Sequence, residues 1–205
     1  IAQIVGGNCK AVLCATHDTG SAVEGIPMEG NHPYISSGTW SLLGVENDHP
    51  ITSRESWQAN FTNEGGAWYR FRYLKNIMGL WLIQETRRQL IRQGQEMSYA
   101  ELEQEALKVK PFQCFVDPDA PEFMKPGHII DDVKEFCRKT GQHVPETIGE
   151  VMRCIYESLA MKYRLAIEEM QKITGKKYEC IYMIGGGIKD KLLCQLTANA
   201  CGIKV

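Results

Sequence analysis

The sequence lacks the features that mark membrane, secreted and nucleic-acid-binding proteins. It has no apolar run near the ~20 residues that cross a bilayer, and its first residues, IAQIVGGNCK, do not form a signal peptide. It also lacks an excess of one charge, since 23 basic and 25 acidic residues give a formal net charge of −2. Such a balance does not suit binding to nucleic acid or anionic lipid. We therefore expect a cytoplasmic protein with small-molecule or protein partners.

Metal-ligand and redox motifs are also missing. The eight cysteines form no C-x-x-C pair, and no group of His, Cys and Asp has metal-ligand spacing. Most cysteines lie within apolar segments, and we interpret them as buried reduced thiols. No protein metal site is expected, and any metal ion would arrive with a nucleotide.

The length is that of one domain. Its 205 residues, 43% of them hydrophobic, are enough for a single large core. The four tryptophans are expected to lie in this core or to cover a sheet. Ile1 enters in mid-pattern without a methionine, and residues 203–205 look like the start of a strand. We therefore expect residues 1–205 to be one domain of a longer protein, truncated at both ends.

Strand-like segments dominate the first third of the chain. Residues 11–15 are predicted to form a buried strand that ends in the polar residues 16–20. Residues 33–45 predict a hairpin, because two apolar runs flank residues 36–39. A second hairpin is predicted where Gly65 and Gly66 separate two candidate strands.

Helical periodicity dominates the rest. Apolar residues recur at helical spacing, Ser98 and Glu101 have the capping-box spacing, and Gly175 and Gly202 are placed to end helices. In chain order we expect helices over residues 76–92, 98–108, 131–139 and 145–174, a strand over 178–185 and a last helix over 189–200.

The three glycines Gly185, Gly186 and Gly187 stand between a predicted strand and a predicted helix. Glycines let a ring or a phosphate approach the backbone, and a helix N-terminus offers unpaired N–H groups. The spacing is neither G-x-G-x-x-G nor that of a P-loop. A tight structural turn would give the same pattern.

Two further groups of polar residues suggest phosphate chemistry. Residues 36–39, Ser-Ser-Gly-Thr, combine hydroxyls with a glycine, which suits a phosphate, although a hairpin turn alone also explains them. His17 and Asp18 are a candidate general-base pair, because a carboxylate beside a substrate hydroxyl can take its proton during phosphoryl transfer. The alternative for Asp18 is the N-cap of the next helix.

In combination, these motifs resemble those of one family. Their order and spacing are similar to those of the rhamnulokinases, which are carbohydrate kinases of the FGGY family. The resemblance covers nearly the whole chain, and SSGTWSL together with LKNIMGLW is its most specific part. The residues that carry it are 16–23, 34–42, 60–66, 74–81, 115–119, 185–187 and 195–198.

The resemblance implies an actin-like, ribonuclease-H-like α/β domain in which helices flank a mixed sheet. This domain would be the nucleotide-binding C-terminal half of a two-domain enzyme, with ATP and the sugar in the cleft that it forms with an N-terminal domain. The implied reaction is ATP-dependent phosphorylation of a ketose, L-rhamnulose, to L-rhamnulose 1-phosphate, with Mg²⁺ held mainly by nucleotide and water. We expect the domain alone to be inactive. The alternatives are another FGGY ketose kinase, such as an L-fuculokinase, and a non-catalytic actin-like nucleotide-binding module.

The resemblance also implies roles for single residues. Asp18 matches the catalytic base, His17 and Thr19 flank it near the sugar, and Asn76 matches a sugar-contacting position. On the ATP side the matching residues are Gly38, Thr39, which is the phosphate-binding threonine, Gln84, Gly185, Gly186 and Gly187.

Two positions depart from the family pattern. Gly20 stands where alanine is usual, and Asn199 stands where an aspartate is expected. We expect the glycine to add backbone freedom beside the base and the asparagine to change capping or charge on the last helix. Neither departure removes a residue with an implied catalytic role.

Overall fold

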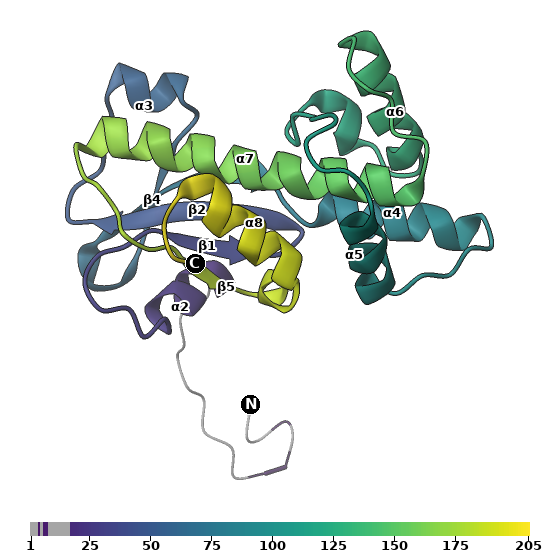
Figure 1. Ribbon diagram of the computed structural model, residues 1–205. Coiled ribbons are helices and arrows are strands. Elements are labelled where there is room, and N and C mark those ends of the chain that lie inside the picture. The colour runs from purple at the N-terminus through teal and green to yellow at the C-terminus, as the bar shows by residue number, and fades with distance from the viewer. Residues whose placement is uncertain (1–3, 5, 8–16) are drawn as a thin grey trace.

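A five-stranded mixed sheet forms the centre of the computed structural model, which describes residues 4, 6–7 and 17–205 (Figure 1). The strand predicted over residues 11–15 lies outside the described residues. The sheet order is β3-β4-β2-β1-β5; β1 and β5 are parallel, and the other neighbours are antiparallel. The strands are β1 (Tyr34–Ser37), β2 (Trp40–Asn47), β3 (Thr62–Gly65), β4 (Phe71–Met78) and β5 (Tyr182–Ile184).

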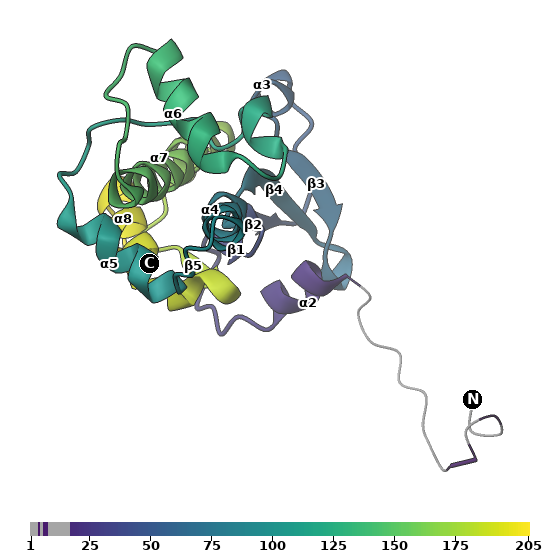
Figure 2. The same cartoon turned by 90° about the vertical axis from the view of Figure 1, so that its right-hand side faces the viewer.

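Helices lie on both faces of the sheet (Figures 1 and 2). Lys75 of β4 forms an ion pair with Glu169 of α7 at 2.6 Å, whereas Arg72 of the same strand faces Gly20 of α2. Side chains alternate along a strand, so α7 and α2 cover opposite faces. The helices are α2 (Asp18–Glu24), α3 (Arg54–Gln58), α4 (Trp81–Arg92), α5 (Tyr99–Lys108), α6 (Ile129–Lys139), α7 (Ile148–Thr174) and α8 (Lys191–Cys201).

Most predicted helices begin and end where the sequence signals stand. The capping box of Ser98 and Glu101 is present at α5, and Thr147 and Glu150 form another at α7. Gly175 ends α7 with a φ of 68°. These residues satisfy backbone groups that have no partner inside a helix. None of the helices in the described ranges is long and apolar enough to cross a membrane.

The helix predicted from Asn76 is wrong in its first residues. Asn76 lies in β4, which pairs with β2 along its whole length, and the helix α4 begins at Trp81. Apolar residues such as Ile77 and Leu80 fit the helical period, but the eight-residue ladder with β2 outweighs that local pattern. Gly79 separates strand from helix, and its added Cβ would lie 2.4 Å from the Ser41 Oγ.

Two other expectations differ from the structure. The strand predicted over residues 178–185 is regular only in β5, and Cys180 makes an isolated bridge with Lys204. Trp57 and Trp68, predicted to be core or sheet-covering residues, are 75% and 85% exposed. They lie in the short helix α3 and in the 3-10 turn η1 (Ala67–Tyr69), outside the stacked layers.

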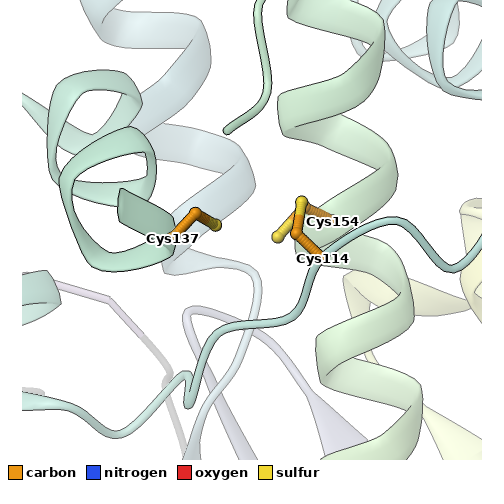
Figure 3. A group of neighbouring side chains, drawn as sticks. All are labelled: Cys114, Cys137 and Cys154. Carbon is orange, nitrogen blue, oxygen red and sulfur yellow. The ribbon is translucent and has the colours of Figure 1, made fainter. Parts of the chain in front are cut away.

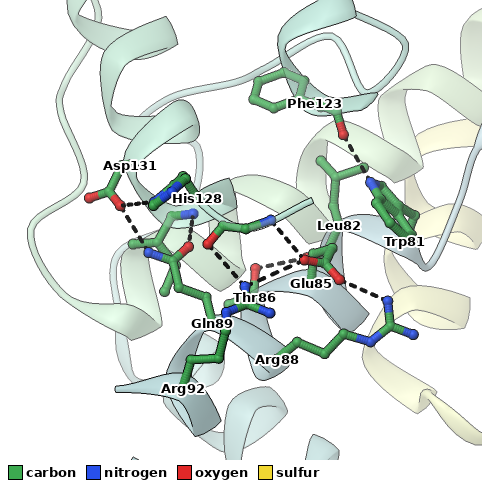
Figure 4. A network of polar contacts seen from close by, with 12 residues as sticks. Trp81, Leu82, Glu85, Thr86, Arg88, Gln89, Arg92, Phe123, His128 and Asp131 are labelled. Carbon is green, nitrogen blue, oxygen red and sulfur yellow. Dashed lines mark hydrogen bonds and ion pairs between the residues drawn. The ribbon is translucent and has the colours of Figure 1, made fainter. Parts of the chain in front are cut away.

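Polar contacts fix α4 to α6 and to the 3-10 turn η2 (Pro121–Met124) (Figure 4). The Gln89 amide donates to Asp131 at 2.9 Å and accepts from the Ile130 N–H at 2.9 Å. The Trp81 indole N–H donates to the Phe123 carbonyl at 2.9 Å. Because α4 also carries Gln84, these contacts set the position of a predicted site residue.

Glu85 is the buried charge of this network, with 2% of its side chain exposed. Arg88 donates to its carboxylate at 2.8 Å, the Gly127 N–H donates at 3.1 Å, and Arg92 lies 3.6 Å away. Burial raises the pKa of the Glu85 carboxyl, but the bonds from Arg88 and Gly127 and the charges of Arg88 and Arg92 outweigh it. The net effect is a pKa below the usual value, so the group is held as a carboxylate.

We expect Glu85→Gln to lower the free energy of unfolding by about 1–2 kcal/mol, because the amide loses charge-assisted bonds to half-exposed arginines. Because the pKa of Glu85 is lower in the folded state, its full stabilising effect is present at pH values above the unfolded-state pKa of about 4.3. This stabilisation is lost as the pH falls through the folded-state pKa. The difference in Tm between wild type and variant therefore shrinks in acid.

The matched control for this measurement is Glu96→Gln. Glu96 is 83% exposed and lies 3.9 Å from Arg87, so its loss should change Tm little. Equal destabilisation by both variants, or a Glu85 effect that does not change with pH, would contradict the role given to Glu85.

Candidate active site

The glycine run and the β1–β2 turn lie against each other. Because β1 and β5 are parallel neighbours, the chain leaves both strands at the same edge of the sheet, after Ser37 and after Ile184. A Cβ added at Gly187 would lie 2.0 Å from the Ser37 Oγ, and one at Gly185 would lie 2.6 Å from the Ser37 carbonyl oxygen. Gly185 also has a φ of 90°. Packing therefore requires these two glycines.

Gly186 differs from its two neighbours. It is exposed, and a Cβ added there would have no atom within 4 Å. It lines a cavity of about 490 Å³ between α4, α5 and the glycine turn, whose walls include Leu80, Ile83, Gln84 and Tyr99. A cavity of this size, mostly apolar with a few polar groups, suits a small-molecule ligand. A ligand can approach the backbone at Gly186 closely.

Two acidic side chains in this cavity wall are already engaged. Asp190 caps α8 by accepting the Leu193 N–H at 3.0 Å, and it also accepts the Tyr156 hydroxyl at 2.6 Å. Burial and then the Asp190 charge raise the pKa of Tyr156, which keeps that hydroxyl as a donor. Glu103 accepts the Leu192 N–H at 3.1 Å. The helix α8 is thus held firmly beside the glycine turn.

The β1–β2 turn also contacts the start of α4. Thr39 donates its hydroxyl to the Gln84 side-chain oxygen at 3.2 Å. The Gly38 carbonyl accepts the Leu80 N–H at 2.9 Å, and the Thr39 carbonyl accepts the Trp81 N–H at 3.2 Å. Thr39 is exposed, so its hydroxyl can also reach a ligand. The structure therefore brings together all the residues predicted on the ATP side.

His17 and Asp18 stand at the start of α2, on the other face of the sheet. His17 is the N-cap, since its Nδ1 accepts the Gly20 N–H at 3.1 Å, and the alternative of Asp18 as the N-cap is wrong. Asp18 is the first helical residue, and its carboxylate accepts the Thr19 N–H at 2.7 Å. The Asp18 side chain is fully exposed. Its carboxylate is therefore open to a ligand.

A partly buried ion pair, which the sequence did not predict, lies below this segment. Arg72 of β4 is 1% exposed, and its Nη2 lies 3.1 Å from the Glu64 carboxylate of β3. The Nε2 of His17 lies 3.8 Å from the same carboxylate oxygen. A Cβ added at Gly20 would lie 3.3 Å from the Arg72 guanidinium. Gly20 thus lets α2 approach Arg72, so the glycine is explained by packing and not by the expected backbone freedom. The signal in the sequence that could have indicated the ion pair was an arginine between the apolar residues of a strand.

Asn76 connects the two groups of residues. It is exposed and lies four positions after Arg72 in β4, so both side chains are on the α2 face. It pairs with Leu42 of β2. Leu42 lies two residues after Trp40, and Trp40 directly follows the turn residue Thr39. Its side chain has no hydrogen-bond partner among the residues that the structure describes. Asn76 therefore lies on the α2 face of the sheet near the β1–β2 turn, and within the described residues no hydrogen bond joins its side chain to His17, Asp18 or Thr19.

We expect Gly187→Ala to lower the free energy of unfolding by about 1–3 kcal/mol, because the new methyl group would overlap the Ser37 side chain. Gly186→Ala is the matched control, since its methyl group enters open space. Denaturant unfolding of the two variants checks this. Equal stability of both would show that the close contact with Ser37 does not exist.

Comparison with known proteins identifies the family. The model of the FGGY family of carbohydrate kinases, C-terminal domain, matches residues 33–205. A rhamnulokinase from Oceanobacillus iheyensis is 46% identical over 97% of this chain, and one from Halalkalibacterium halodurans is 47% identical over 95%. This chain spans 41% of the length of each of them.

Solved structures support the fold at low sequence identity. A xylulose kinase from Bifidobacterium adolescentis matches with a TM-score of 0.59 and 18% identity, over 91% of this chain and 35% of its own. A gluconate kinase from Lactobacillus acidophilus matches with a TM-score of 0.56 and 16% identity, over 84% and 34%. The expected actin-like α/β fold, a mixed sheet flanked by helices, is thereby confirmed. The chain belongs to the FGGY family of carbohydrate kinases and contains the C-terminal domain of that family.

Proposed function

We propose that this chain is the nucleotide-binding C-terminal domain of an ATP-dependent sugar kinase that converts L-rhamnulose to L-rhamnulose 1-phosphate. The observation that carries the proposal is the contact of the Gly185–Gly187 turn with Ser37, which directly precedes Gly38 and Thr39, beside a ligand-sized cavity. The choice of sugar follows the rhamnulokinases that are 46–47% identical to this chain. An N-terminal domain would supply the other wall of the cleft, and the domain alone would be inactive.

ATP fits the cavity between α4 and α5. Leu80, Ile83 and Tyr99 offer an apolar wall for the base, and Gly186 lets the nucleotide approach the backbone. The hydroxyl of the exposed Thr39 donates to Gln84, which lines the cavity, and is proposed to bind the phosphates. Mg²⁺ would neutralise charge that develops on the phosphates. Because Asp190 is engaged as a helix cap, we assign the ion mainly to nucleotide and water.

Asp18 is proposed as the general base. Its exposed carboxylate can accept the proton of the sugar's primary hydroxyl as that oxygen attacks the γ-phosphate. The Glu64–Arg72 pair lies next to His17, which caps the helix that carries Asp18. His17, Thr19 and Asn76 are proposed to contact the sugar. Closure of the second domain would exclude water from the reacting groups.

In the complete kinase, Asp18→Asn should lower kcat by about 10²-fold or more, because the amide cannot take the hydroxyl proton. ATP binding should stay near normal. Asp48→Asn is the control, since Asp48 is 86% exposed and its only described ion pair is with Arg70. Steady-state kinetics with L-rhamnulose, and with L-fuculose as a competing ketose, check this. A variant that keeps most of its kcat would remove Asp18 from the mechanism, and faster turnover of L-fuculose would change the assigned sugar.

Gly186→Val should weaken ATP binding more than sugar binding, because its methyl groups extend into the proposed nucleotide cavity. Gly186→Ala places one methyl group at the same position and should have a smaller effect. Calorimetric titration of both variants with ATP and with sugar separates the two sites. Unchanged ATP affinity in a folded Gly186→Val protein would make the glycine turn purely structural.

A further inference from the structure

Three cysteines from three separate elements meet in the interior (Figure 3). None of them lines the cavity beside the glycine turn. Cys114 lies in the loop after α5, Cys137 lies on α6, and Cys154 lies on α7. Their sulfur atoms all lie within 4.8 Å of one another. The side chains are 3%, 0% and 2% exposed, and all three are free thiols. No step of the proposed reaction uses them.

The separations suit a shared metal ion. A Zn–S bond of about 2.3 Å places the sulfurs of a tetrahedral centre about 3.8 Å apart, so small side-chain rotations would complete the site. A disulfide would instead need a distance of about 2.05 Å between two of the sulfurs, and the third thiol would remain unpaired. Thiolates select soft cations, because hard cations prefer oxygen ligands.

A small cavity beside the cluster leaves space for one more ligand. It has a volume of about 10 Å³ and is lined by Cys114 and Cys154, with Lys110 and Arg153 among its other walls. This is about the space that a single water molecule needs. Arg153 is already paired with Glu157, and Lys110 is the cation of the cavity wall that would offset the negative charge of the thiolates.

The two carboxylates that also line this cavity are engaged elsewhere. Glu157 binds Arg153 at 2.5 Å and accepts the Phe112 N–H at 2.8 Å. Glu150 accepts the N–H groups of Thr147 and Glu146 at the start of α7, at 3.1 and 2.7 Å. The sulfurs of Cys114 and Cys154 and the side-chain amide oxygen of Gln113 are therefore the ligand atoms that the cavity leaves available.

We propose that Cys114, Cys137 and Cys154 bind a closed-shell thiophilic cation of the Zn²⁺ and Cu⁺ class, with a fourth position open to water. The ion would join α6 and the loop after α5 to α7. That loop reaches the active site, because Asp119 accepts the N–H of Met78 at the end of β4 at 2.7 Å. Metal binding would thus stabilise the segment behind the site without taking part in the chemistry.

Metal analysis of the chain purified under reducing conditions tests the proposal. We expect about one thiophilic ion per chain, and the analysis distinguishes zinc from copper. Titration of the metal-free protein with Cd²⁺ should give ultraviolet thiolate-to-metal absorption, and added Zn²⁺ should raise Tm. Cys114→Ser should weaken Cd²⁺ binding by at least about 100-fold. Cys180→Ser, whose thiol lies outside the cluster, should leave the binding unchanged.

Three results would overturn the proposal. The first is a disulfide between any two of the three cysteines in the protein isolated without oxidant. The second is equal Cd²⁺ affinity in the wild type and in a folded Cys114→Ser variant. The third is a wild-type protein that shows neither the Cd²⁺ absorption nor the Zn²⁺-dependent rise in Tm. This third result decides the question if the Cys114→Ser variant does not fold.

Discussion

The contact between the Gly185–Gly187 turn and Ser37 is the constraint on which the proposed nucleotide site depends. Parallel pairing of β1 with β5 brings the two strand ends to one edge of the sheet. The backbones can then meet only because Gly185 and Gly187 lack a Cβ. The turn after Ser37 supplies the carbonyls that receive the first N–H groups of α4. Gln84 and the cavity beside it are placed as a consequence.

The sugar side depends on a different contact in the same sheet. The register of β3, β4 and β2 places the Glu64–Arg72 pair below α2 and Asn76 four residues further along β4. One sheet thus carries the proposed base on one face and the proposed phosphate-binding turn at its edge. The same sheet therefore positions both the exposed aspartate of a short helix and one wall of the proposed nucleotide cavity, although these are built from segments distant in the chain.

Local signals predicted much of the fold, and long-range contacts explain the remainder. The capping box of Ser98 and Glu101, the glycine that ends α7 and both hairpins are visible in the sequence because each depends on residues close in the chain. Asn76 was wrongly predicted to lie in a helix, because its strand conformation depends on pairing with β2, which the local sequence does not show. The partner of Arg72 and the meeting of Cys114 with two distant cysteines likewise depend on tertiary packing. The roles of the site residues came from the family resemblance and are still predictions.

The most direct test of the account is hydrogen exchange of the complete kinase with a non-hydrolysable ATP analogue and Mg²⁺. If the nucleotide binds between α4, α5 and the glycine turn, residues 37–39, 80–84 and 185–190 should exchange more slowly when it is present. A second cavity, about 680 Å³, lies between residues 115–118 and α7 and contains none of the predicted site residues. Protection confined to that second cavity, with no change at the glycine turn, would contradict the account.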